Sequence, residues 1–424
     1  MFSDMNHRSL LTGVLPFLLV FVQPVQAVDL NWSGFGTLGY VESDASRNYQ
    51  RFINDSGTIK RDSVLGGQVD VKFDQHWGAT VQARLAPSDH YESRWQAALT
   101  WAFVSWRPSD DWLIRLGKIR LPLMLNTENL DVGATFDLAR LPQEVYSISP
   151  MTDVWGVSVS KSWLAETMEW NLEAYTGRAD PYWRYYGREV RDGNPTPGSW
   201  FIPLEVASSG LVLTARDIGN TFRIGIHEVN ASRVGGPSQS EIPYRQVTPN
   251  FGFYDMLSSS KVDNLRIPVQ TMAASISLPA EVKVTAEYAR MKVDSASEGL
   301  TRWGAYLAVS KRIGAWTPYV YYAKTKSSSG ALDLYQDIDA SAERNRRGSA
   351  LYNYQKLQAD IVSPYEQWTG ALGTSFRLTP RSIFKAEWAH TQTGVASNFV
   401  DAPSGGNSGD MHFNIFSLSY NFTF

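Results

Sequence analysis

Apolar and polar residues alternate strictly along much of this chain, and this pattern constrains the fold more than any other feature. In the segment 412–424, Phe416 and Leu418 fall on one side, while Ser417 and Ser419 fall on the other. Because successive side chains of a strand point to opposite faces, a period of two predicts a β-strand with one apolar and one polar face. The alternation does not decide whether the apolar face packs into a soluble core or contacts lipid.

The same pattern recurs in about 16 stretches of roughly ten residues, each bounded by turn residues. No segment after Val28 shows a helical period of useful length. An even number of strands is what closed antiparallel barrels of bacterial membranes have. The predicted strands are 30–41, 65–74, 77–85, 95–106, 112–118, 154–161, 168–176, 210–216, 221–229, 267–278, 282–291, 303–312, 316–324, 367–378, 382–391 and 412–424.

The connections between these strands alternate between short and long. Such alternation predicts tight turns at one rim and long loops at the other, as at the periplasmic and extracellular ends of outer-membrane barrels. The short connections are 74–76, 107–111, 162–167, 217–220, 278–280, 313–315 and 378–381. The long ones are 42–64, 119–153, 177–209, 230–266, 325–366 and 392–411.

The amino terminus has the pattern of an export signal. Arg8 precedes the apolar run 10–22, and small residues follow at a cleavage site, 25–27. This predicts a signal peptide over residues 1–27 and one mature domain over 28–424. The alternative, an uncleaved membrane helix, is disfavoured because the run is short. We expect the exported chain to reach the outer membrane of a Gram-negative cell.

Composition excludes several classes of protein. Aromatic residues make up 13% of the chain and charged residues 19%, which is unlike a disordered chain. The net charge of -3 gives no reason to expect nucleic acid as a partner. The absence of cysteine excludes disulfides and Cys-ligated metal sites. Together with the signal peptide and loop alternation, aromatic residues bunched at strand ends favour lipid on the outside of the sheet.

Two features carry a resemblance to a known family. Phe424 ends an alternating aromatic strand, and the segment R-L-G-K-I-R-L-P-L-M, which begins at Arg115, follows the fifth predicted strand. In these features the chain resembles the Gram-negative porin superfamily, and especially its groups with an R-x-G-K plus Pro segment, phosphate-selective relatives included. The P-E-F-x-G-D signature of enterobacterial general porins is absent, which leaves the solute open. The resemblance implies a barrel of about 16 strands, usually trimeric, with a third loop (119–153) folded into the lumen and a terminal Phe read by the barrel-assembly machinery.

Charged residues on and near this third loop are the candidates for selectivity. Fixed charges at the narrowest cross-section of a pore raise the local concentration of ions of opposite sign. The alternative for each is a solvated lumen charge away from the constriction. Mixed signs argue against strong ion selectivity. The candidates are Arg84, Arg115, Arg120, Glu128, Asp131, Asp137 and Arg140.

These observations predict an outer-membrane porin that allows passive diffusion of small hydrophilic solutes or ions, without a catalytic residue, metal or cofactor. A barrel hydrolase is one alternative, although the six His are dispersed and no H-E-x-x-H or G-x-S-x-G occurs. A plugged structural or adhesive barrel is another. The expected partners are outer-membrane lipid, lipopolysaccharide, the barrel-assembly machinery through Phe424, and two further copies in a homotrimer. The basic run 344–347 could contact lipopolysaccharide phosphates or be merely solvated.

Overall fold

A computed structural model of the chain describes residues 28–149, 151–189, 197–239, 241–294 and 300–424. The predicted signal peptide, 1–27, lies outside the described residues and stays a prediction.

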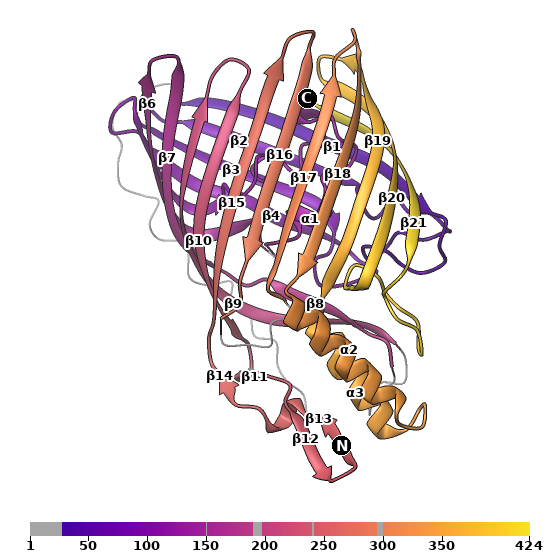
Figure 1. Ribbon diagram of the computed structural model, residues 1–424. Helices are drawn as coiled ribbons and strands as arrows, with labels where there is room; N and C mark the ends of the chain where they lie inside the picture. The colour runs from indigo at the N-terminus through magenta and orange to yellow at the C-terminus, as the bar shows by residue number, and fades with distance from the viewer. Residues whose placement is uncertain (1–27, 150, 190–196, 240, 295–299) are drawn as a thin grey trace, which may run out of the picture.

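The chain forms one antiparallel sheet that closes on itself as a barrel of sixteen strands (Figure 1). Closure is made by β1, which pairs with β2 on one side and with β21 on the other. Every predicted strand corresponds to one barrel strand, so the strand prediction is confirmed. The strands are β1 (Asp29–Ser43), β2 (Val64–Lys72), β3 (Trp77–Pro87), β4 (Trp95–Trp106), β5 (Trp112–Arg120), β6 (Asp153–Ala165), β7 (Met168–Ala179), β9 (Gly198–Arg216), β10 (Thr221–Arg233), β15 (Leu265–Leu278), β16 (Val282–Met291), β17 (Arg302–Lys311), β18 (Trp316–Ser327), β19 (Tyr365–Thr379), β20 (Ser382–Ser397) and β21 (His412–Thr423).

Side-chain exposure decides which face of the sheet is outside. Val81 is 48% exposed, whereas its neighbour Gln82 is 5% exposed. In β21, Leu418 is 57% exposed and Ser417 only 4%. The apolar rows therefore point away from the barrel axis and the polar rows point into the lumen, which is the arrangement of a barrel in lipid.

The third loop, residues 121–152, folds into the lumen as predicted. It carries a 3-10 turn η1 (Gly133–Thr135) and a short helix α1 (Gln143–Tyr146). The backbone N–H of Leu125 donates to the Glu287 carboxylate on β16 at 2.8 Å, and that of Ala139 donates to the Tyr319 hydroxyl on β18 at 2.8 Å. The loop that leaves β5 thus crosses to the opposite wall.

Close packing holds the loop in this position. Leu121, Val145 and Ile148 are buried against wall residues such as Tyr306. At Gly304 an added Cβ would lie 1.8 Å from the Glu144 carbonyl oxygen, so glycine permits α1 to rest directly on the backbone of β17. The hydrophobic core of this barrel therefore lies inside the lumen, between the loop and the wall.

The long connections form a cap at one end of the barrel, and here one expectation was wrong. Two helices, α2 (Ser329–Glu343) and α3 (Ala350–Val362), pack as a hairpin although no useful helical period was predicted. Serine caps start both helices, because Ser328 accepts from the Ala331 N–H and Ser349 from the Tyr352 N–H. Among the described residues no helix is long and apolar enough to cross a membrane.

The same cap contains short strands. β8 (Tyr182–Gly187) pairs with the outer part of β9, which extends beyond the barrel wall. The connection between β10 and β15 carries β11 (Ser238–Gln239), β12 (Tyr244–Thr248), β13 (Phe251–Tyr254), η2 (Met256–Ser258) and β14 (Lys261–Val262). Figure 1 shows this cap at the bottom of the view and the short turns at the top.

Candidate pore constriction

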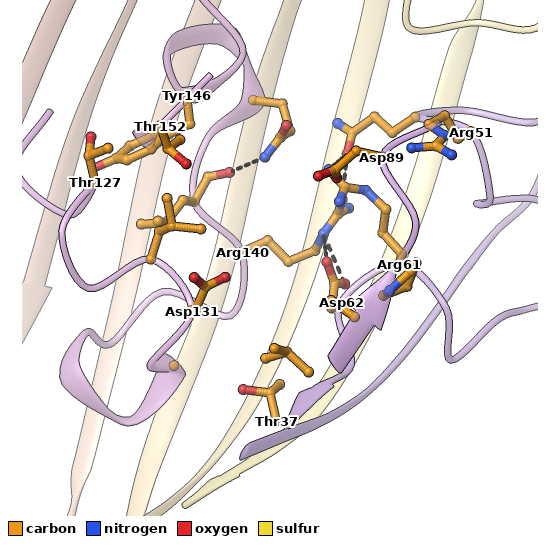
Figure 2. Close-up of a pocket in the computed structure, with 18 of the residues that line it drawn as sticks. Thr37, Arg51, Arg61, Asp62, Asp89, Thr127, Asp131, Arg140, Tyr146 and Thr152 are labelled. Atoms are coloured by element: carbon orange, nitrogen blue, oxygen red, sulfur yellow. Dashed lines mark hydrogen bonds and ion pairs between the residues drawn. The ribbon is translucent and has the colours of Figure 1, made fainter. Parts of the chain in front are cut away.

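A polar cavity lies between the third loop and the wall formed by the first strands. Its volume is about 480 Å³. The lining combines loop residues, among them Thr127 and Asp131, with Thr37 of β1 and with Arg61 and Asp62 of the connection before β2 (Figure 2). Because third-loop residues face wall residues across it, this cavity is the candidate constriction.

Charged side chains from several elements converge on the cavity. The cavity lining holds five arginines against three aspartates, so the formal charge of the lining is positive. The arginines are Arg51, Arg61, Arg84, Arg140 and Arg184, and the aspartates are Asp62, Asp89 and Asp131. Two of the arginines are also paired with carboxylates just outside the lining, Arg51 with Glu92 and Arg184 with Glu92 and Asp401, which reduces the attraction of the lining for anions.

Asp131 is the centre of one ion cluster. Its Oδ2 lies 2.7 Å from Arg120 Nη2, and its Oδ1 accepts a hydrogen bond from Arg84. Arg84 also lies 3.7 Å from the exposed Asp89. Burial of Asp131 disfavours its charged form, but the guanidinium groups of Arg120 and Arg84 outweigh burial and hold the pKa of the carboxyl below its usual range. Asp131 therefore stays ionised at neutral pH.

Arg140, which also belongs to the third loop, forms a second cluster with residues of the connection before β2. Figure 2 shows its side chain extending from the third loop toward Asp62, and the two groups are 3.2 Å apart. Arg140 also donates to the Gln50 side chain. Burial, followed by repulsion from Arg140, lowers the pKa of nearby Arg61 to about 10. Both arginines keep their positive charge at neutral pH.

The seven predicted selectivity residues fall in three places. Arg84, Asp131 and Arg140 line the passage, and Arg120 lies behind Asp131. Asp137 is turned toward the wall, where its carboxylate accepts a hydrogen bond from Ser375 at 3.0 Å.

The remaining two, Arg115 and Glu128, line a different cavity of about 350 Å³ beside β5, β6, β7, β9 and β10. There Arg115 lies 3.9 Å from Glu173 and Glu128 lies 3.6 Å from Arg223. The third loop thus brings only part of the predicted set together at one site.

Several residues of the passage were missed by sequence reasoning. Arg51, Arg61 and Asp62 come from the first long connection, and Arg184 comes from β8 in another. The only local signal was the charged pair Arg61–Asp62 just before a strand. Which loops fold back over the lumen depends on tertiary packing, so the alternating pattern carries no information about them.

His227 is a buried histidine on the lumen side of β10. His227 lies between two hydroxyl groups, with Nδ1 2.9 Å from the Tyr175 hydroxyl and Nε2 3.2 Å from Thr271 Oγ1. Across the part of the chain that the structure describes, no group of three His, Cys, Asp or Glu residues could hold a metal ion. Both ring nitrogens of His227 thus face hydroxyl groups and not an acid of the kind that orients a catalytic histidine.

Comparison with known proteins identifies the fold. No protein-family model matches the sequence, and no curated protein matches it. Among solved structures, OprB of Pseudomonas putida has a TM-score of 0.54 and 9% identity, covering 94% of each chain. The outer membrane channel DcaP of Acinetobacter baumannii has a TM-score of 0.52 and 11% identity, covering 94% of this chain and 97% of that one.

A third similar structure is the trimer form of OmpT, an outer membrane protein of Vibrio cholerae, with a TM-score of 0.50 and 9% identity. It covers 94% of this chain and 100% of that chain. At such low identity the likeness shows the fold alone. The chain therefore has the fold of outer-membrane β-barrels.

Proposed function

We propose that this barrel is a diffusion porin, in which small hydrophilic solutes and ions pass through the lumen at a rate set by the passage beside the third loop. The observation that carries the proposal is the inward loop, which packs against one part of the wall and leaves beside it a cavity lined by charges of both signs. The excess of arginine over aspartate gives this passage a modest preference for anions.

We further propose how the channel reaches the membrane, what surrounds it there, and that it carries out no reaction. Residues 1–27 are a signal peptide, so the chain isolated from the outer membrane would begin at Val28 by intact mass. Three copies assemble, and lipid with lipopolysaccharide surrounds them. The barrel-assembly machinery reads Phe424. The barrel has no enzymatic role, because a hydrolase needs a nucleophile, a base and an orienting acid at one site, whereas His227 contacts hydroxyl groups.

Conductance across a planar lipid bilayer tests the proposal. The purified barrel should give stepwise currents in groups of three, and its reversal potential in a potassium chloride gradient should show a modest preference for chloride. Absence of current under these conditions would count against transport and favour a plugged barrel.

One substitution ties the selectivity to the passage. Arg140→Gln removes a positive charge from the lining and should shift the reversal potential toward potassium. The matched control is Arg266→Gln, which removes the same charge from an exposed residue, paired with Glu228, that does not line the passage. If both variants shift the potential equally, the passage beside the third loop is not the constriction.

A further inference from the structure

A cavity larger than the two already described lies under the cap, at the end of the barrel with the long loops. Its volume is about 830 Å³, which is within the range of sites that enclose small organic molecules. One side of it is the inner face of the barrel over β9, β10, β15 and β16. The other side is formed by α3 and by the hairpin of β8 with the outer part of β9.

The wall here departs from the polar lining of the lumen elsewhere. Val206, Val229, Val269 and Met291 stand at lumen-facing positions of four adjacent strands. The same row of β10 continues toward the short turns as His227 and then Arg223. An apolar surface at this level contributes nothing to the passage of hydrated ions. It can, however, bind the apolar part of a solute.

The cap completes the apolar lining. Leu357 and Ile361 of α3 line the cavity opposite the wall. Trp183 and Trp200 line it from the hairpin, with the Tyr185 ring between them at centroid distances of 6.0 Å and 6.3 Å. Rings of this kind provide large, rigid apolar surface for a ligand.

One buried cation in the lining has no described carboxylate within ion-pair distance. Arg302, at the start of β17, is only 5% exposed. Its Nη2 donates to the Ser147 carbonyl, and its guanidinium lies 3.7 Å from the centre of the Tyr365 ring. Its Nε and Nη1 have no hydrogen-bond partner, and no described carboxylate lies within 4.0 Å.

Three other buried arginines differ from Arg302 in this respect. Arg120, Arg188 and Arg223 each lie within ion-pair distance of a carboxylate. The acid that faces Arg302 from the third loop is Glu144, and its Oε1 accepts from Gln367 and Thr369 instead. Burial of an unpaired cation is unfavourable, so the site favours a ligand that supplies the missing negative charge.

A second polar atom points to the same conclusion. The indole Nε1 of Trp183 is buried without a hydrogen-bond partner. Native proteins satisfy nearly all such donors, and a turn of this ring, which lines the cavity, would present the N–H to an acceptor on a ligand. Two kinds of donor and a large apolar surface therefore meet in one chamber.

We propose that this chamber binds amphipathic carboxylates, with the carboxylate on Arg302 and an aromatic or alkyl body among the apolar side chains. The inference goes beyond the diffusion function and does not depend on it, because binding is measured whether or not the barrel conducts. A turn of the Arg302 side chain away from Tyr365 would present Nε and Nη1 to the ligand.

Calorimetric titration of the barrel in lipid nanodiscs, with empty nanodiscs as the blank, tests the proposal. The probes are 2-naphthoate, the neutral 2-naphthamide, and acetate, which has the charge without the body. We expect saturable binding of 2-naphthoate, with 2-naphthamide and acetate each bound at least about tenfold more weakly. Equal affinity for 2-naphthamide, or equal affinity for acetate, would overturn the proposal.

Variants locate the site. Arg302→Met should weaken 2-naphthoate binding by about tenfold or more, while Arg266→Met, which removes an exposed arginine near the same end of the barrel, should leave it unchanged. If Arg302→Met does not fold, Leu357→Trp fills the chamber from α3 and should abolish binding with the arginine in place. Unchanged binding in a folded variant of either kind would refute the assignment.

Discussion

Asp131 shows how one side chain can set both the charge and the stability of the passage. It is buried between two arginines, and Asp131→Asn would leave both of them without that carboxylate. We expect a loss of about 3 kcal/mol in the free energy of unfolding and a reversal potential shifted toward chloride. Urea unfolding in lipid vesicles and bilayer recording measure these two effects.

A matched variant separates charge from burial. Asp89→Asn removes the same charge from the same passage, but Asp89 is exposed and lies 3.7 Å from Arg84. It should change the free energy of unfolding by no more than about 0.5 kcal/mol. If the two variants are equally stable, the cluster around Asp131 does not hold the third loop in place.

The lowered pKa of Asp131 also predicts how this stability depends on pH. The folded pKa lies below that of an unfolded aspartate, so the carboxylate contributes stability above the unfolded pKa and loses it as pH falls through the folded value. The difference between wild type and Asp131→Asn should therefore be constant between about pH 5 and pH 8 and shrink below about pH 4. Unfolding titrations across this range provide the check, and a difference that shrinks near pH 6 would contradict the assignment.

Single residues were the hardest part to predict from sequence. Parity correctly placed Arg84 and Arg115 on the lumen side of their strands, because the direction of a strand side chain is a local property. No local sequence signal indicated that Arg84 would form an ion pair with Asp131, or that Arg115 would form one with Glu173. These partnerships depend on the path of the third loop across the lumen.

At the level of elements, the α2–α3 hairpin depends on a buried arginine for its position. Arg188, just after β8, contacts Asp339 of α2 and Asp360 of α3. Arg188→Met would leave the buried Asp360 unpaired, at a cost of about 3–5 kcal/mol. The hairpin should then detach locally, and trypsin should cut faster at the exposed arginines of 344–347.

The control for this prediction is Glu343→Gln. Glu343 is exposed and pairs with Lys356 of the same hairpin, so its loss should change the rate of cleavage little. Equal protection of wild type and Arg188→Met would show that the hairpin is held by its apolar contacts alone.

The two helices were missed for a physical reason. Their buried positions include Gln355, Lys356 and Gln358 as well as Ile338 and Ala359, so polar groups interrupt the apolar stripe that reveals a helix. The Gln355 and Gln358 amides bond to the backbone of β13 and η2. Tertiary hydrogen bonds of this kind have no period along the sequence.

At the scale of the whole molecule, the orientation of the sheet is the feature on which the lumen depends. Val81→Arg would place a charge in lipid near the middle of β3, at a cost of about 2–4 kcal/mol. Thr80→Arg places it one residue away, opposite Asp70 on the lumen side, and should change stability by less than about 1 kcal/mol. Unfolding in vesicles gives both values, and the reverse order would mean that the sheet is inside out.

The overall fold was largely predictable, because the alternation of apolar and polar residues and the alternation of short and long connections can both be seen in the sequence. Which face of the sheet contacts lipid could be inferred only from the export signal, the aromatic residues at the strand ends and the alternation of loop lengths. The exposure of Val81 beside the buried Gln82 decided it.

The seam between β1 and β21 has a consequence for biogenesis. Gly34 and Phe424 exchange two backbone hydrogen bonds, of 2.9 Å and 3.0 Å, across nearly the full length of the sequence. Until β1 pairs with β21, the unclosed sheet has two edge strands with unpaired backbone groups, and these can pair with strands of a neighbouring chain. Any change that delays the pairing of β1 with β21 should therefore produce aggregates during biogenesis rather than closed barrels with altered permeability.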